Sequence, residues 1–366
     1  GLDALVAELG RLALNIQPRL AEGGFRLPID RVFTLKGIGT VVTGTVVSGS
    51  LSTGETVAAL PRGMQLRVRS IQVHNESAPR ACAGQRAALN LPDAAKEELE
   101  RGDVLATPGS VAPSLMLDAR LHLSARAPHE IVQRARVRIH HQTREVMARV
   151  VLLEADALRP GESALVQLRL ESPLSVLAGD AFVMRSYSPM FVIGGGTIVD
   201  AHPPKRRKVS GADDVARHEV SPAAERVAEE LDRGGTRGIR LADLCVRCGI
   251  ADAQLRELLQ SLRAERRAWV GRQDLWFGLD AVEQMQSAIV ARLAQLHTQE
   301  PLRATVALNA VASGAAPSPE QRECFRITME LLREAGKVAL SGERVALATH
   351  SPQWPPRLAA ARDRLM

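Results

Sequence analysis

The segment KGIGTVVTGTV, residues 36–46, has the glycine spacing of a phosphate-binding loop, GxxxxG, at Gly39 and Gly44. Such a loop needs a lysine after its last glycine to reach the phosphates, then serine or threonine for magnesium, then a helix. Here Thr45 follows Gly44, so no ammonium group is supplied, and Val42 stands where the dinucleotide form GxGxxG needs its third glycine. The surrounding residues are β-branched, which favours a strand. We therefore expect a glycine-bent strand of a small barrel and no nucleotide loop.

Three other clusters could do chemistry, and each has a structural alternative that fits better. Gly194–Gly196 stand between apolar strand residues with no helix behind them, which indicates close backbone approach and no phosphate site. His140 and His141 are neighbours on a predicted strand and point to opposite faces, so they are poorly placed to bind one metal. Cys245 and Cys248 form a CxxC without a second pair or a nearby histidine, so helix packing is favoured over zinc or redox chemistry. We expect no metal site.

A basic run, Lys205, Arg206, Arg207 and Lys208, follows two prolines. Prolines and charges break all periodicity, so the segment is predicted to be a solvated hinge, with contact to RNA phosphate as the functional alternative.

The composition describes a folded protein of several domains with a bias toward polyanionic partners. Its 366 residues exceed one ordinary core, and 45% hydrophobic with 24% charged residues is typical of globular chains. The net charge is +6, which favours nucleic acid, whereas 3% aromatic residues excludes base stacking as the main binding mode. No apolar run would span a bilayer, and the start of the chain reads as an amphipathic helix and not a signal peptide. We expect a cytoplasmic monomer with no membrane contact.

Periodicity predicts a helix followed by two all-β domains. Leucine and valine recur at three- and four-residue steps in the first helix, residues 1–22. Short β-rich runs separated by turn residues then predict one barrel over residues 23–110 and a second over residues 111–203.

The rest of the chain is predicted to be helical and repeated. After a basic linker at 204–218, residues 219–279 and 280–350 each show a helix, a turn, a longer helix with a basic end and a short hairpin. That order is typical of a winged helix. Residues 351–366 are expected to form a linker and the start of a further element.

Two barrels followed by winged helices is a rare order, and at this point the residues resemble a known family. "FRLPIDRVFTLKGIGTVVTGTVVSGSLSTGE" and "RVRSIQVHNESAPRACAGQRAALNL" closely resemble the second domain of the bacterial selenocysteine-specific elongation factors, SelB. "FVIGGGTIVD" resembles the end of their third domain, and the repeats resemble their winged-helix tail.

The resemblance implies a pocket for the aminoacyl group of selenocysteyl-tRNA in the first barrel. By motif match its polar members are Asp30, Arg31 and Arg86, with two guanidiniums to hold the selenolate and Asp30 to orient an arginine. Asp30 and Arg31 are neighbours on a strand, so a bulge is required to bring both to one face. Lys36 is a weaker candidate for contact with RNA.

The resemblance also implies what this chain does not carry. The family begins with a GTPase domain that uses GTP and Mg²⁺, and the motifs of that domain are missing from this sequence, so we expect no enzyme activity and no cofactor here. The first helix, residues 1–22, resembles the last element of that domain. The family's last winged helices, to which recognition of the selenocysteine-insertion hairpin in mRNA is attributed, are also expected to be missing. The remaining partners implied are selenocysteyl-tRNA and the ribosome, at recoded UGA codons.

The residues alone leave two alternative classes of protein open. One is a DNA-binding regulator with winged helices and ligand-sensing barrels. The other is a different translational GTPase relative, although those lack winged helices.

Overall fold

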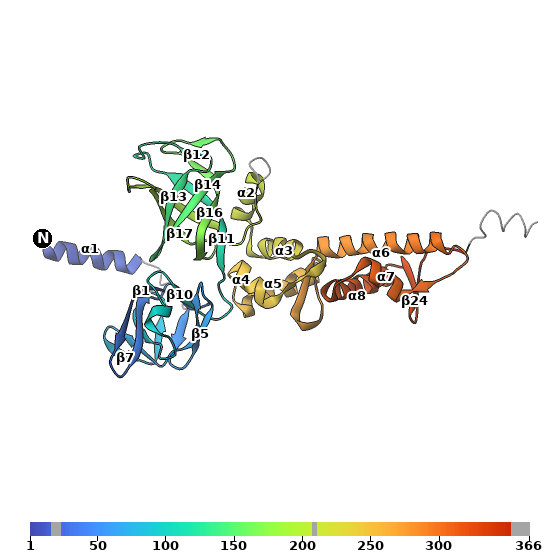
Figure 1. Ribbon diagram of the computed structural model, residues 1–366, viewed down its shortest axis with the longest axis horizontal. Helices are drawn as coiled ribbons and strands as arrows, with labels where there is room; N and C mark the ends of the chain where they lie inside the picture. The colour runs from blue at the N-terminus through green and yellow to red at the C-terminus, as the bar shows by residue number, and fades with distance from the viewer. Residues whose placement is uncertain (16–22, 207–210, 353–366) are drawn as a thin grey trace, which may run out of the picture. The chain divides into compact units, whose positions relative to one another are not determined.

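The computed structural model describes residues 1–15, 23–206 and 211–352, and the chain forms two compact units (Figure 1). The first unit comprises Gly1–Val220 with Cys245–Ala251, and the second comprises Ser221–Leu244 with the residues from Asp252 on.

The first unit begins with an exposed helix and an eight-stranded antiparallel sheet. The strands of the sheet run in the order β5-β4-β10-β1-β2-β9-β6-β7, and a separate pair, β3 and β8, lies beside it. The sheet curls around one buried cluster that includes Phe25, Leu27, Ile29, Val42 and Leu89. The elements are α1 (Leu2–Asn15), β1 (Arg26–Leu35), β2 (Gly39–Thr45), β3 (Ser50–Ser52), β4 (Thr56–Leu60), β5 (Met64–Arg67), β6 (Ser70–Val73), β7 (Glu76–Ala78), β8 (Arg80–Cys82), β9 (Arg86–Asn90), η1 (Lys96–Glu98) and β10 (Val104–Ala106).

The glycine-rich segment forms the hairpin between β1 and β2, and no helix follows it. Gly37 and Gly39 adopt positive φ angles of 80° and 95° in the turn, a conformation that favours glycine. At Gly44 a Cβ atom would lie 2.2 Å from the carbonyl oxygen of Pro28, so only glycine fits against β1 there. The expectation of a glycine-shaped barrel strand is confirmed.

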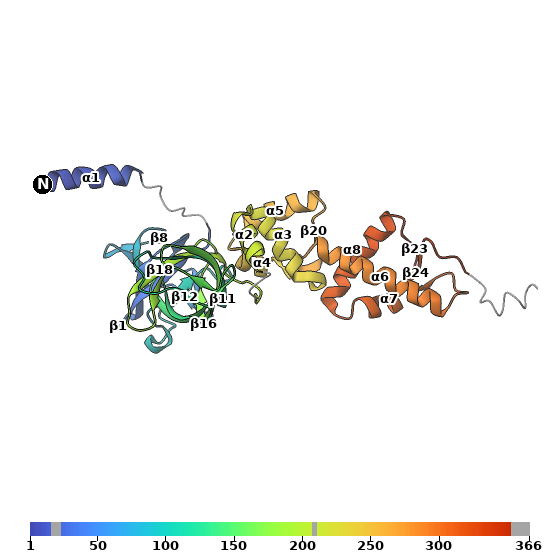
Figure 2. The ribbon, with the colours of Figure 1, turned by 90° about the horizontal axis from the view of Figure 1, so that it is seen from above.

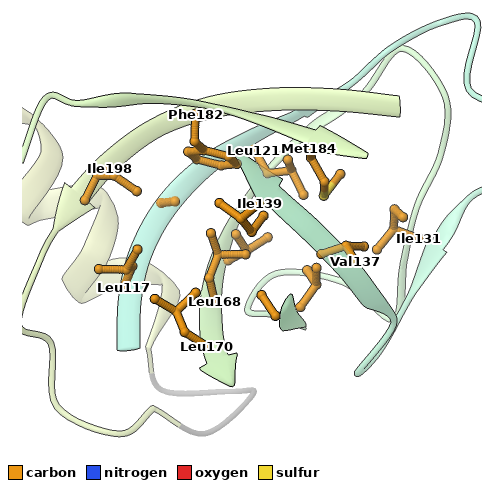
Figure 3. Close-up of a cluster of buried hydrophobic side chains, with 14 of the residues drawn as sticks. Leu117, Leu121, Ile131, Val137, Ile139, Leu168, Leu170, Phe182, Met184 and Ile198 are labelled. Carbon is orange, nitrogen blue, oxygen red and sulfur yellow. The ribbon is translucent and has the colours of Figure 1, made fainter. Parts of the chain in front are cut away.

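The second β domain is a closed barrel in the order β11-β16-β14-β13-β17-β18. Alternate residues point inward and form one core, in which Leu121, Ile139, Leu168 and Met184 are all fully buried (Figure 3). The elements are β11 (Pro113–Leu123), β12 (Ile131–Val132), β13 (Arg136–His141), β14 (Arg144–Leu152), β15 (Ala157–Leu158), β16 (Ser163–Ser175), β17 (Ala181–Ser186) and β18 (Val192–Asp200). The strands β12 and β15 form a small separate sheet.

The triple glycine of β18 permits close packing of strands, as the sequence indicated. A Cβ atom at Gly196 would lie 1.9 Å from the carbonyl oxygen of Arg120, and one at Gly194 would lie 2.3 Å from that of His122. Both partners belong to the neighbouring strand β11.

Buried ion pairs join the two barrels. The guanidinium of Arg26 on β1 donates to both oxygens of Asp180, which precedes β17, at 2.7 and 2.9 Å. His141 Nε2 lies 3.2 Å from the same carboxylate, and all three side chains are largely buried. A second pair joins Arg144 on β14 to Asp103 at 3.1 Å.

The end of the predicted basic linker is a helix, α2 (Ala212–Val220), that packs on the second barrel. Val215 is buried against Val151, Leu165 and Val199, because α2 presents an apolar residue to the outside of the barrel wall. Arg120 on β11 fixes the end of the helix by bonding both oxygens of Glu219 at 2.6–3.0 Å. The end of the predicted linker is therefore a helix that packs on the barrel. The basic run for which a hinge was predicted precedes this helix, and its last two residues lie outside the described part of the chain.

The residues from Ser221 on form two consecutive helix–turn–helix–hairpin modules. Their small sheets have the orders β19-β21-β20 and β22-β24-β23. The long helix α6 packs along α7 and α8 of the second module (Figures 1 and 2). The elements are α3 (Ala223–Gly234), η2 (Gly235–Arg237), β19 (Ile239–Arg240), α4 (Leu241–Cys248), α5 (Asp252–Ala264), β20 (Ala268–Val270), η3 (Arg272–Asp274), β21 (Leu275–Gly278), α6 (Leu279–Gln299), β22 (Val306–Ala307), α7 (Leu308–Ala315), α8 (Pro319–Glu334), β23 (Val338–Ser341) and β24 (Arg344–Leu347). The predicted order of β-barrels followed by tandem winged helices is confirmed.

The bounds of α8 follow from its sequence. Ser318 accepts a hydrogen bond from the backbone of Gln321, whose side chain accepts one from the backbone of Ser318 in return, and Pro319 occupies the first turn. At the other end Gly336 has a φ of 67°, which stops the helix. This helix is the second of the helix–turn–helix pair in the module.

Candidate functional site

Asp30 and Arg86 form a bidentate ion pair on the outer face of the first barrel. The Arg86 guanidinium donates to both carboxylate oxygens, at 3.1 Å to Oδ1 and in a shorter contact to Oδ2. The Thr43 hydroxyl donates to Asp30 Oδ1 at 2.6 Å. Because the Asp30 side chain is 23% exposed and that of Arg86 is 52% exposed, the pair remains accessible from solvent.

A β-bulge places Asp30 beside Arg31 on this face. The pairing of β1 with β2 passes from Ile29 opposite Gly44 to Arg31 opposite Thr43, so Asp30 is the extra residue. Ile29 is fully buried in the core, whereas Arg31 is exposed. The bulge that the adjacency of the two residues required is present.

Arg31 supplies a positive charge that is not neutralised. It forms no ion pair or hydrogen bond through its side chain with any residue that the structure describes, while Arg86 is held by Asp30. Burial raises the pKa of Asp30, but hydrogen bonds from Arg86 and Thr43 outweigh this and hold the pKa below its ordinary value. The three predicted site residues therefore lie together with a net charge of +1.

The other predicted RNA contacts are distributed differently. Lys36 is exposed in the turn after β1, five residues beyond Arg31, which is about 17 Å along an extended strand. Lys205 is exposed. Arg207 and Lys208 lie outside the described residues.

Arg206 is buried in the structure, so its prediction as a contact to RNA is wrong. Its side chain is 7% exposed, and its Nε donates to the fully buried carboxylate of Asp118 at 2.6 Å. A second contact joins it to Asp214 on α2 at 3.2 Å. Because the guanidinium is engaged inside the first unit, we exclude Arg206 from the RNA contacts.

Five arginines that sequence reasoning missed gather on the outer wall of the second barrel. Arg136 on β13 lies opposite Arg149 on β14, which in turn lies opposite Arg169 on β16. Arg138 lies opposite Arg185 on β17. Like charges directly opposite each other in a sheet are destabilising, and a polyanion bound to this surface would relieve their repulsion. We call these five residues the arginine face.

Carboxylates neutralise only part of the arginine face. Arg136 bonds both oxygens of Glu171 at 2.9 and 2.7 Å, and Arg138 pairs with Glu145. Five arginines against two glutamates leave three excess positive charges. The signal was present in "RARVRIHH", where arginine alternates with apolar residues that point into the barrel.

An aromatic residue borders the arginine face at the hairpin between β17 and β18. The Tyr187 ring centroid lies 4.8 Å from the guanidinium carbon of Arg136 and 5.7 Å from that of Arg138. Tyr187 is 47% exposed, and Met190 and Phe191 on the same hairpin are 52% and 44% exposed. Cationic side chains beside exposed rings suit a nucleic acid that offers both phosphates and bases.

The two histidines that the sequence analysis considered as metal ligands do not form a catalytic site together. His141 belongs to the junction between the barrels, and His140 Nε2 lies 3.6 Å from Glu145 on the barrel exterior. Among the described residues no group of three or more histidine, cysteine or acidic side chains could hold a metal ion. Within the same residues, the helices are all too short or too polar to cross a membrane.

Both barrels match known protein families. Residues 39–106 match elongation factor Tu domain 2, and residues 118–205 match the β-barrel domain of selenocysteine-specific elongation factors. The selenocysteine-specific elongation factor of Desulfomicrobium baculatum is 33% identical over 353 residues, which is 96% of this chain and 56% of that protein. Across nearly its whole length the chain is similar to the selenocysteine-specific elongation factors. It spans about half the length of this relative.

Two further relatives and one solved structure are also similar to this chain. The selenocysteine-specific elongation factor of Escherichia coli (strain K12) is 33% identical over 266 residues, covering 71% of this chain and 40% of that protein. A crystal structure of a bacterial selenocysteine-specific elongation factor shares the fold with a TM-score of 0.72, at 20% identity, over 95% of this chain and 53% of that one. Elongation factor Tu 2 of Streptomyces avermitilis is 30% identical over 184 residues, 49% of this chain and 47% of that protein. These matches favour a translation factor over a DNA-binding regulator.

Proposed function

We propose that the chain binds selenocysteyl-tRNA, with the aminoacyl group at Asp30, Arg31 and Arg86 and the RNA backbone on the arginine face. The observation that supports this most strongly is the bulge at Asp30, which brings the three side chains together on an accessible surface. A strand without a bulge would direct Asp30 and Arg31 to opposite sides of the barrel wall.

The charge of the aminoacyl site suits a selenolate. A selenol is far more acidic than an alcohol, so the side chain of selenocysteine is largely an anion at neutral pH. The site offers a net charge of +1, and the guanidinium of Arg31 has no carboxylate partner among the described residues. Arginine stays protonated throughout the accessible pH range, so this positive charge is permanent.

The same charge rejects seryl-tRNA, the biosynthetic precursor. A neutral hydroxyl gains little from Arg31, whereas a close contact between opposite charges contributes on the order of 2–5 kcal/mol when it is desolvated. Asp30 limits the site in a second way, since its ion pair with Arg86 leaves one uncompensated cation and not two.

The arginine face supplies binding that does not depend on sequence. Each phosphate neutralised releases counterions, so affinity for tRNA is expected to fall steeply with salt. Lys36 and Lys205 are exposed and remain candidates for further phosphate contacts.

The functions beyond tRNA binding would be those of a longer protein that contains this chain. We infer that the whole protein uses GTP and Mg²⁺ in a GTPase domain and delivers selenocysteyl-tRNA to the ribosome in the cytoplasm at recoded UGA codons. Recognition of the mRNA hairpin would belong to winged helices other than the two described here. The support is the similarity to this family across 96% of this chain.

The test compares Arg31→Ala and Arg86→Ala in the protein that carries this chain. Affinity for selenocysteyl-tRNA is measured against seryl-tRNA with the same tRNA body, and Arg69→Ala, on the exposed exterior of the same barrel, is the control. We expect either site variant to reduce the preference by about tenfold or more, and the control to leave it unchanged. An undiminished preference in both variants would show that the aminoacyl site lies elsewhere.

A further inference from the structure

The second winged helix contains an open groove of about 570 Å³ between α7 and α8, bordered by β23. Most of the surface that faces the groove is apolar. The apolar residues of the lining are Leu308, Ala312, Phe325, Met329 and Leu340. The first and last α8 residues that line it, Arg322 and Arg333, are eleven residue steps apart. At about 1.5 Å per residue the groove runs roughly 16 Å, which is three turns of a helix.

The two ends of the groove carry cations without partners. Arg322 and Arg333 are exposed, and within the part of the chain that the structure describes neither side chain forms an ion pair. Arg326, between them, is already held by Glu323 and Glu330 at 3.1 and 3.2 Å. The groove is therefore apolar along its floor and positive at both ends.

We propose that this groove binds an acidic amphipathic helix of another protein. Apolar side chains at every third or fourth position would fill the floor, as in other complexes where a helix lies in a groove. Carboxylates near the two ends of the bound helix would pair with Arg322 and Arg333. The proposal does not depend on tRNA binding by the barrels.

The lining favours a peptide over a nucleic acid as the occupant. Phe325, the aromatic side chain in the lining, is 6% exposed, so it presents no open ring face on which a base could stack. A phosphate backbone would also leave the apolar floor in contact with water. A helix with one apolar face satisfies both parts of the groove, because it covers the floor and brings charge to the rim.

A displayed library of helix-forming peptides about 14 residues long provides the probe, since that length spans the groove. Peptides are selected against the full chain and then titrated, by fluorescence anisotropy, against three variants. Arg322→Glu with Arg333→Glu reverses the charge at both ends, Ala312→Phe fills the floor, and Arg263→Glu on the exposed side of α5 is the matched control. Circular dichroism confirms that each variant is folded.

Selected peptides should be acidic and amphipathic, and both groove variants should weaken their binding at least tenfold while the control changes it less than twofold. Selection of basic or non-amphipathic peptides, no selection at all, or equal binding to the groove variants would overturn the proposal. So would a duplex RNA that binds tightly in a manner that depends on Arg322 and Arg333. Self-association that Ala312→Phe abolishes would assign the groove to a second copy of this chain instead.

Discussion

At the scale of single residues, the hydroxyl of Thr43 orders the aminoacyl site. It donates to Asp30 at 2.6 Å and lies opposite Arg31 across the two strands. The carboxylate that holds Arg86 is thereby fixed from two sides. Thr43 touches no proposed ligand atom, so it is a positioning residue.

Thr43→Val should raise the pKa of Asp30 toward its ordinary value, because the variant removes one hydrogen bond to the ionised form. The preference for selenocysteyl-tRNA should fall several-fold, while Thr43→Ser, which keeps the hydroxyl, should retain both properties. NMR titration of the Asp30 carboxyl carbon measures the pKa directly. An unchanged pKa in Thr43→Val would show that this hydrogen bond does not stabilise the carboxylate.

Residue types at the site could be assigned from sequence, but their geometry could not. Asp30, Arg31 and Arg86 follow from the resemblance to a family, whereas the bulge that unites them depends on the pairing of β1 with β2. Gly44 permits that pairing by its close approach to Pro28, and no local pattern reveals such a contact. Arg206 was misjudged because its partner Asp118 is 88 residues away in the chain.

At the scale of secondary-structure elements, the arginine face combines binding with a cost in stability. Arg149 lies between Arg136 and Arg169 on neighbouring strands, and like charges in those positions repel. The alternation of arginine and apolar residues predicts outward arginines on each strand. The neighbours that they face depend on strand register, which the sequence leaves open.

Arg149→Gln should leave the free energy of unfolding unchanged or raise it by up to about 1 kcal/mol, since it removes the middle charge. Affinity for tRNA should fall, and the slope of log K against log salt should decrease by about 1. Arg159→Gln, on an exposed turn of the same barrel, is the control and should alter neither quantity. A salt slope that stays the same in Arg149→Gln would mean that Arg149 contacts no phosphate.

The junction between the barrels predicts a dependence of stability on acid. Burial raises the pKa of Asp180, but the adjacent His141 and the hydrogen-bonded guanidinium of Arg26 outweigh it and hold the pKa well below its ordinary value. The unfolded carboxyl titrates near 3.9. A lowered pKa in the folded state means that the stabilisation is fully present above that pH and is lost as the pH falls further.

Asp180→Asn should lower the free energy of unfolding at neutral pH by roughly 3–5 kcal/mol, because Arg26 is left buried without its counter-charge. It should also reduce the acid dependence below about pH 4. Chemical denaturation as a function of pH measures both effects, with Asp93→Asn on the exposed surface as the control. Equal stability of the Asp180 and Asp93 variants would show that the ion pair does not hold the barrels together.

At the scale of the whole molecule, the order of the predicted domains indicated the fold more clearly than any single motif did. Period-two runs predicted the barrels, and the repeated helix–turn–helix–hairpin pattern predicted the winged helices, because each depends on the local alternation of apolar residues. The segment after the second barrel was harder to interpret, since prolines and basic residues hid the helix at Ala212–Val220. The proposed domain boundaries remain predictions.

The measurement that tests the central claim most directly is the affinity of the whole protein for selenocysteyl-tRNA and seryl-tRNA as a function of pH. Asp30 stays ionised in mildly acidic solution because its pKa lies below the ordinary value near 3.9. A site that recognises the selenolate should therefore lose its preference as the selenol is protonated, while the affinity for seryl-tRNA changes little. A preference that persists after protonation, or that is absent at neutral pH, would contradict recognition by charge at Asp30, Arg31 and Arg86.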